Sequence, residues 1–117
     1  GHDSAHVAEE SLAVHWPHYA AYEAGEALIR QMRALDVHDT LAVSPQLPKL
    51  RGTPARVIWG ASDQFQKVEY GERFARDLGI SLERIDGGKH FTPEDHPERI
   101  AAALQSLVAE VEARGNF

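Results

Sequence analysis

Residues 54–60, with the sequence PARVIWG, constrain the fold most, because they form a compact apolar run that ends at a glycine. Such a run is typical of a strand buried on both faces of a parallel sheet. Residues 68–78 follow with apolar side chains at helical spacing, and Gly79 supplies a stop signal. Residues 80–85 alternate imperfectly, which indicates a second strand near a sheet edge. The order strand, helix, strand predicts a right-handed βαβ unit.

The segment before this unit has a helical pattern. Residues 3–15 predict a short helix that a break around Pro17 interrupts, since proline disfavours helix in the residue before it. Apolar positions at intervals of three and four predict a second helix over about residues 19–35. Residues 36–52 contain two prolines and a terminal glycine, and they predict a connection with one short helical turn near residues 39–43.

The segment after the βαβ unit predicts a long final helix. Asp95 is the predicted N-cap, Pro97 lies in the first turn, and Glu98 completes a capping box. Apolar residues then recur as a stripe that is predicted to be buried: Ile100, Leu104, Leu107, Val108 and Val111. The chain is therefore predicted to be α/β in class, with a helical segment over residues 1–50 and a βαβα unit over residues 51–117.

Composition excludes several functional classes. Of the 117 residues, 43% are hydrophobic and 26% are charged, which is an ordinary balance for a globular chain. The net charge is −6 and the basic residues are scattered, so we expect no nucleic-acid partner and no anionic membrane partner. The absence of cysteine excludes disulfides and thiolate chemistry. With no long apolar run and no signal-peptide pattern, a cytoplasmic location is predicted.

Two residues form a candidate acid–base pair. Asp63 lies three residues after Gly60, and His90 lies five residues after Ile85. Both strands of a βαβ unit end at the same sheet edge, where ligands and catalytic residues collect, so we expect the carboxylate and the imidazole to be neighbours. Either residue alone is more often a turn residue or a surface group. Their combined placement favours a functional pair.

Three segments resemble the C-terminal signature of α/β-hydrolases, in particular haloalkane dehalogenases and epoxide hydrolases. They are residues 57–63 (VIWGASD), 85–91 (IDGGKHF) and 93–98 (PEDHPE). In that family the acid after the penultimate strand orients the histidine after the last strand, and the last helix begins with a Glu/Asp-x-Pro element. The similarity covers about residues 50–113, and residues 18–50 more loosely resemble the helix and linker that lead from the lid to the core.

The resemblance implies a catalytic triad of which this chain carries two members. Asp63 would fix the tautomer of His90, and His90 would take a proton from a serine or from the water that hydrolyses an ester on an aspartate nucleophile. The sequence contains neither G-x-S-x-G nor G-x-D-x-G, so the nucleophile is missing and its identity stays open. The implied reaction is hydrolysis of an ester, epoxide or carbon–halogen bond in a small molecule, without a cofactor.

The chain as a whole can be part of a larger hydrolase or a separate module. Because it does not begin with Met, and Gly1-His2 is compatible with a cloning remnant, we expect it to be part of a longer protein. Its expected partner is the N-terminal half of the hydrolase or a second copy, since a two-stranded sheet with an exposed edge is marginal by itself. The alternative is a non-catalytic structural or interaction module that keeps the fold signature.

Several other residues are candidates for the site. Trp16 and Phe91 are the predicted substrate-binding residues; Tyr19 and Tyr22 accompany Trp16, although such aromatics more often serve packing. Four histidines near the N-terminus raise the question of a metal site: His2, His6, His15 and His18. Metal sites need three or four ligands on ordered elements, so none is predicted. The other carboxylates near His90 have structural explanations, Asp95 as the cap and Asp86 as a turn residue, and Glu94 is a further alternative.

Overall fold

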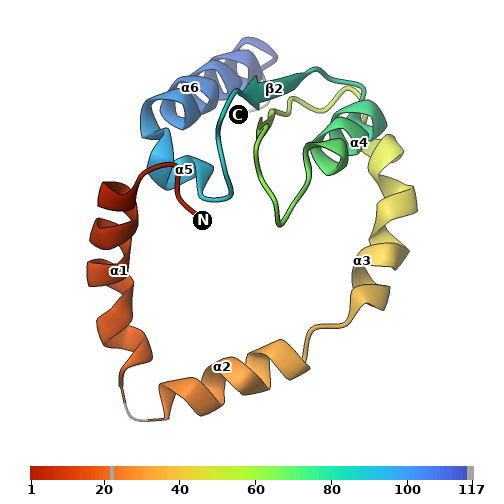
Figure 1. Cartoon of the computed structure of the whole chain (residues 1–117). Helices are drawn as coiled ribbons and strands as arrows, with labels where there is room; N and C mark the ends of the chain where they lie inside the picture. Colours follow the sequence, from red (N-terminus) through yellow and green to blue (C-terminus); the bar gives the residue numbers. More distant parts are fainter. Residues whose placement is uncertain (22, 116–117) are drawn as a thin grey trace.

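The computed structural model describes residues 1–21 and 23–115, which form a mixed arrangement of helices and two strands (Figure 1). Its elements, in chain order, are α1 (Ala5–Tyr19), α2 (Ala24–Arg33), α3 (Val37–Val43), the 3-10 helix η1 (Ser44–Leu50), β1 (Val57–Gly60), α4 (Val68–Leu78), β2 (Leu82–Ile85), α5 (Thr92–Asp95) and α6 (Pro97–Ala113). Among the described residues, no helix combines the length and the apolar character that crossing a membrane requires.

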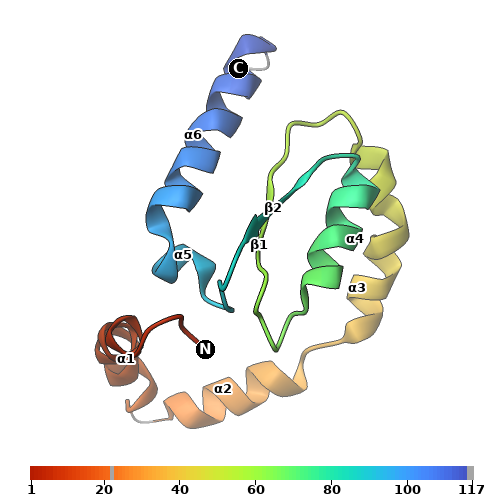
Figure 2. The same ribbon diagram turned by 45° about the horizontal axis from the view of Figure 1, so that its top comes forward.

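The two strands form a parallel sheet with α4 as the crossover between them. Val57 pairs with Leu82 at one end of the register, and Gly60 pairs with Ile85 at the other. The strands lie between α4 and α6 (Figure 2). The predicted order of strand, helix and strand is therefore confirmed, although each strand has four residues and is shorter than the segment predicted for it.

Helix α4 packs against Trp59 of β1 through a glycine, a position that has no room for a side chain. A Cβ atom on Gly71 would lie 2.8 Å from the ring of Trp59. The indole N–H of Trp59 donates to the carbonyl of Gln66 at 2.7 Å, and its ring stacks on Phe74. Gly79 then ends the helix in the left-handed conformation, at φ 72°, as the sequence predicts.

The predicted helix break at Pro17 is wrong, because α1 continues through this residue to Tyr19. Pro17 lies in the last turn, so it removes one backbone donor, while the N–H of Ala20 still donates to the carbonyl of Trp16. Helix α2 begins at Ala24 and not near residue 19, since Glu23 before it has a left-handed backbone, at φ 64°.

The predicted connection over residues 36–52 is mostly helical. The carboxylate of Asp36 accepts a hydrogen bond from the N–H of His38 at 2.8 Å and so caps α3. The two prolines that favoured a loop, Pro45 and Pro48, lie in η1. The segment thus consists of two short helices in succession.

The predictions for the last helix need two corrections. His96, and not Asp95, is the N-cap residue of α6, because the short helix α5 includes Asp95. The predicted buried stripe is covered only in part: Ile100, Leu107 and Val111 are half-buried, whereas Leu104 is 56% exposed and Val108 is 51% exposed. The stripe does have apolar residues at helical spacing, but the two-stranded sheet offers too little surface to cover them.

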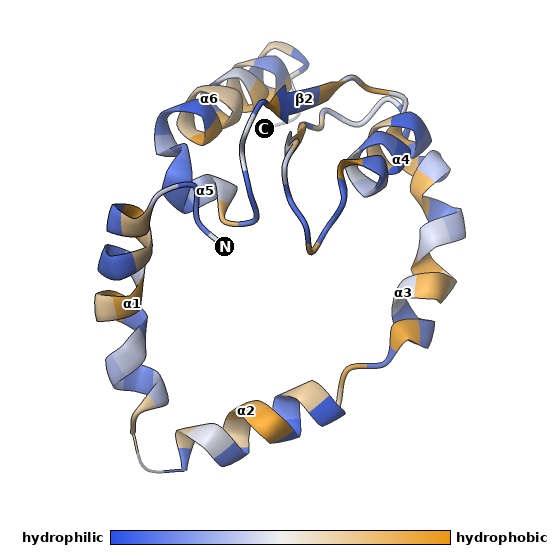
Figure 3. Cartoon of the chain, in the orientation of Figure 1, coloured by the Kyte–Doolittle hydropathy of each residue, from blue (hydrophilic) through white to orange (hydrophobic). Residues whose placement is uncertain are grey.

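Much apolar surface is exposed in this fold. Helices α1, α2 and α3 form an arc that extends away from the sheet (Figure 1), and apolar residues occur along this arc (Figure 3). The radius of gyration is 17.2 Å, whereas a compact domain of this length has about 13 Å. Among the described residues, Ala75 and Ile85 are the buried apolar side chains. The chain therefore has a small core and an open arrangement.

Candidate active site

The loops that follow β1 and β2 leave the same edge of the sheet and are joined by backbone hydrogen bonds. The N–H of Ala61 donates to the carbonyl of Ile85 at 2.9 Å, and the N–H of Ser62 donates to the carbonyl of Gly88 at 2.8 Å. These bonds fix the loop that carries Asp63 against the loop that carries His90.

Gly60 makes this close approach of the two loops possible. A Cβ atom at this position would lie 2.2 Å from the carbonyl oxygen of Lys89 and 2.6 Å from that of Gly88. Both atoms belong to the backbone, so a side-chain rotation could not relieve the contact. The glycine that ends the apolar run is therefore also a requirement of the candidate site.

Asp63 is held on both of its carboxylate oxygens, and its side chain is 5% exposed. Oδ1 accepts hydrogen bonds from the N–H of Phe65 at 2.8 Å and from the N–H of Gln66 at 3.1 Å. Oδ2 lies 2.8 Å from Nδ1 of His90. The expected proximity of the two side chains is confirmed, whereas their catalytic role stays a prediction.

The electrostatics of this pair favour an ionised carboxylate. Burial raises the pKa of Asp63, but the hydrogen bonds from His90, Gln66 and Phe65 together outweigh it and lower the pKa below its ordinary value. Asp63 is therefore charged at neutral pH and accepts hydrogen bonds only. Nδ1 of His90 must then carry the proton, which leaves the lone pair of a neutral ring on Nε2.

The imidazole of His90 is accessible at the sheet edge, with its side chain 35% exposed. The rings of Phe65 and Phe91 contact it edge-on, at centroid distances of 5.5 Å and 5.2 Å. A small open cavity of about 170 Å³ adjoins the pair, with Trp59 and Thr92 in its wall. Within residues 1–21 and 23–115, no hydrogen bond is made by Nε2 of His90. This nitrogen can therefore accept a proton from a group that enters the cavity.

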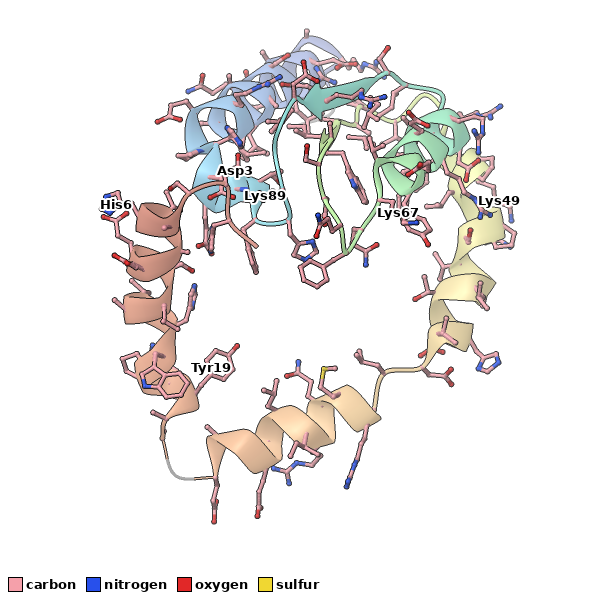
Figure 4. The ribbon with its side chains drawn as sticks, in the orientation of Figure 1. Asp3, His6, Tyr19, Lys49, Lys67 and Lys89 are labelled. Atoms are coloured by element: carbon pink, nitrogen blue, oxygen red, sulfur yellow. The ribbon has the colours of Figure 1, made fainter. Side chains whose placement is uncertain are left out.

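The predicted substrate-binding residues do not gather in one place. Phe91 follows His90 directly and is 42% exposed, so it is close to the pair. Trp16 is 60% exposed on α1 and does not line the cavity next to His90. Tyr19 points into the area that the arc of helices surrounds (Figure 4), and Tyr22 lies outside the described residues.

Three of the four N-terminal histidines pair with carboxylates. His2 contacts Asp95 at 3.0 Å, and two weaker pairs join His6 to Glu10 and His15 to Glu94. In the part of the chain that the structure describes, no group of three or more potential ligands is arranged to hold a metal ion. Asp86, one of the other carboxylates near His90 in the sequence, is exposed to solvent. No sequence pattern signals the interaction of residues 1–3 with the His90 loop, because this interaction joins segments more than 80 residues apart.

Comparisons with known proteins give one likeness. No family model matches the sequence, and no solved structure matches it significantly. Over 108 residues, or 92% of the chain, the sequence is 27% identical to the uncharacterized hydrolase YugF of Bacillus subtilis. The chain is thus similar to a hydrolase. It spans 38% of the length of that relative, and at this identity the likeness suggests a hydrolase without showing the fold family.

Proposed function

We propose that this chain provides the acid and the general base of an α/β-fold hydrolase, with Asp63 as the acid and His90 as the base. The observation that carries the proposal is the 2.8 Å contact between Oδ2 of Asp63 and Nδ1 of His90. Two backbone amides hold the other oxygen of Asp63, so the carboxylate has a fixed orientation. A base that is oriented by a third group is the arrangement that activates a nucleophile in acyl transfer.

In the proposed reaction Nε2 of His90 takes a proton while a nucleophile attacks the substrate. With a serine nucleophile, the proton comes from its hydroxyl group and is later returned to the leaving group. With an aspartate nucleophile, it comes from the water that hydrolyses the ester intermediate. Asp63 stabilises the imidazolium in both cases. The substrate is a small molecule with an ester, epoxide or carbon–halogen bond, and the nucleophile belongs to a polypeptide segment beyond these 117 residues.

Reconstitution tests this proposal. The chain is co-expressed with a polypeptide that carries the G-x-S-x-G or G-x-D-x-G turn and is encoded upstream of Gly1 in the parent gene. The pair is then assayed with a p-nitrophenyl ester, an epoxide and a haloalkane. We expect hydrolysis of at least one substrate by the assembled pair and by neither polypeptide alone. A stable assembly that hydrolyses none of the three would contradict the proposal.

The second candidate is a structural or interaction module, and the exposed surface favours it. The accessible surface is 8866 Å², which exceeds the roughly 6300 Å² of a compact protein of this mass. The excess of about 2500 Å² is as large as that buried in permanent protein interfaces. Part of it lies in an open, mainly apolar groove of about 780 Å³ between α3, η1 and α4. The partner in either candidate is the remaining half of a hydrolase or a second copy of the chain.

Association is therefore expected for the isolated chain. In sedimentation or light scattering over a dilution series, the mass should exceed 13.0 kDa and should fall on dilution. Mass spectrometry of the same sample distinguishes self-association from a companion polypeptide. A monomer at all concentrations that unfolds in one cooperative transition would show that no partner is needed. Association together with persistent inactivity in the reconstitution would favour the interaction module over the hydrolase.

A further inference from the structure

The first three residues of the described chain bind the backbone of the His90 loop. The carbonyl of Gly1 accepts a hydrogen bond from the N–H of His90 at 3.2 Å. Oδ1 of Asp3 accepts one from the N–H of Lys89 at 2.8 Å, and the carbonyl of His2 accepts one from Nζ of Lys89 at 3.0 Å. Figure 4 shows Asp3 and Lys89 next to each other. A segment from the start of the chain thus satisfies two backbone donors beside the proposed base.

These residues are held in turn by a buried carboxylate on α5. The side chain of Asp95 is 1% exposed. Its Oδ1 lies 3.0 Å from Nδ1 of His2, and its Oδ2 accepts a hydrogen bond from the N–H of Asp3 at 3.1 Å. A short hydrogen bond joins the other oxygen of Asp3 to Nε2 of His96. Asp95, which the sequence favoured as a helix cap, therefore anchors the N-terminal segment.

The His90 loop contains two adjacent glycines, so its order depends on contacts with other segments. Gly87 has a left-handed backbone, at φ 75°, and the next residue, Gly88, also has no side chain. Loops of this kind are intrinsically mobile unless other elements hold them. The ring of His2 also stacks on Phe91 at a centroid distance of 4.5 Å, and Phe91 contacts the imidazole of His90. The N-terminal segment consequently restrains both the backbone and the ring of His90.

We propose that Asp3 and Asp95 are positioning residues for His90, through the chain of hydrogen bonds from Asp95 to Asp3 and from Asp3 to Lys89. The inference rests on the proposed function, since it assigns a purpose to the rigid placement of the base. A general base acts only within hydrogen-bond reach of the proton that it removes, and a displacement of about 1 Å lowers the rate about 100-fold. Asp3 and Asp95 thus belong to the candidate site although they contact no reacting atom.

Nuclear magnetic resonance on the full 117-residue chain tests the inference. In Asp3→Ala, the N–H of Lys89 loses its acceptor, and the segment that carries the carbonyl of Gly1 loses one attachment to the loop. Amide hydrogen exchange at Lys89 and His90 should therefore become about tenfold faster. The signal of the downfield Nδ1 proton of His90 should lose intensity, whereas amides within α4 should keep their protection from exchange. Asp3→Asn retains an acceptor and should restore the protection of Lys89. Asp86→Ala is the control, since it removes an exposed carboxylate from the same loop.

Unchanged exchange at Lys89 and His90 in Asp3→Ala would overturn the inference, as would unprotected amides in the unaltered chain. If Asp3→Ala does not fold, Asp3→Glu decides: its longer side chain shifts the acceptor away from Lys89 and should speed exchange there. A separate variant tests the proposed function. Asp63→Asn should abolish the Nδ1 proton signal of His90 and leave the protection of Lys89 intact. A missing Nδ1 signal in the unaltered chain would contradict the acid–base pair, while the amide protection would still decide the positioning role.

Discussion

Replacement of His90 by alanine should lower the kcat of the proposed hydrolase by about 10⁶-fold, since removal of the base from a complete triad has an effect of this size. No other group can substitute for it, because the remaining carboxylate of Asp63 is held by backbone amides and has a lowered pKa. The measurement is single-turnover kinetics of the reconstituted pair at saturating substrate.

Asp63→Asn should have a smaller effect, of about 10⁴-fold. The amides of Phe65 and Gln66 both donate to Oδ1 of Asp63, so an asparagine would keep its carbonyl oxygen there. Its amide group would then face Nδ1 of His90, which would have to release its proton. The proton would move to Nε2, where catalysis needs the lone pair.

The chain contains a matched control for both variants. Nδ1 of His38 lies 2.8 Å from Oδ1 of Asp36, which is the same contact as in the candidate site, but both side chains are exposed. His38→Ala should leave turnover unchanged, and it also leaves the backbone cap of α3 in place. Near-normal turnover in His90→Ala, or equal losses in His90→Ala and His38→Ala, would be incompatible with the proposed base.

The second large effect is expected for Gly60→Ala. The new Cβ atom would lie 2.2 Å from the carbonyl oxygen of Lys89, and contacts of this kind cannot form without movement of the backbone. The free energy of unfolding should fall by about 3 kcal/mol, the upper end for overpacking. The His90 loop would move away from Asp63, so turnover of the assembled enzyme should fall about 100-fold as well. Urea unfolding and the Nδ1 proton signal of His90 measure the two effects.

Gly25→Ala is the matched control for this substitution. Gly25 lies in α2, and a Cβ atom there would have no neighbour within 4 Å. Because alanine favours helix over glycine, the free energy of unfolding should rise by about 0.5 kcal/mol. If Gly60→Ala changes the free energy of unfolding as little as the control does, the two loops do not depend on this close approach.

The central part of the fold could be predicted because its signals are local. The apolar run before Gly60, the helical spacing over residues 68–78 and the stop at Gly79 lie within 26 residues of one another. Each of these patterns reflects the period of one element, and the parallel pairing of β1 and β2 follows from their order. The proximity of Asp63 and His90 follows in the same way, since each residue lies shortly after the end of a strand.

The features that could not be predicted depend on contacts between distant segments, or on their absence. Asp95 has the residue type and position of a helix cap, but its carboxylate binds residues that precede it by more than 90 positions. The stripe on α6 has the pattern of a buried face, yet Leu104 is exposed because nothing in the described chain covers it. The sequence by itself determined the βαβ unit and the two loops that carry Asp63 and His90. The tertiary structure alone decided that residues 1–3 hold the His90 loop, because hydrogen bonds across the chain leave no periodic pattern in the sequence.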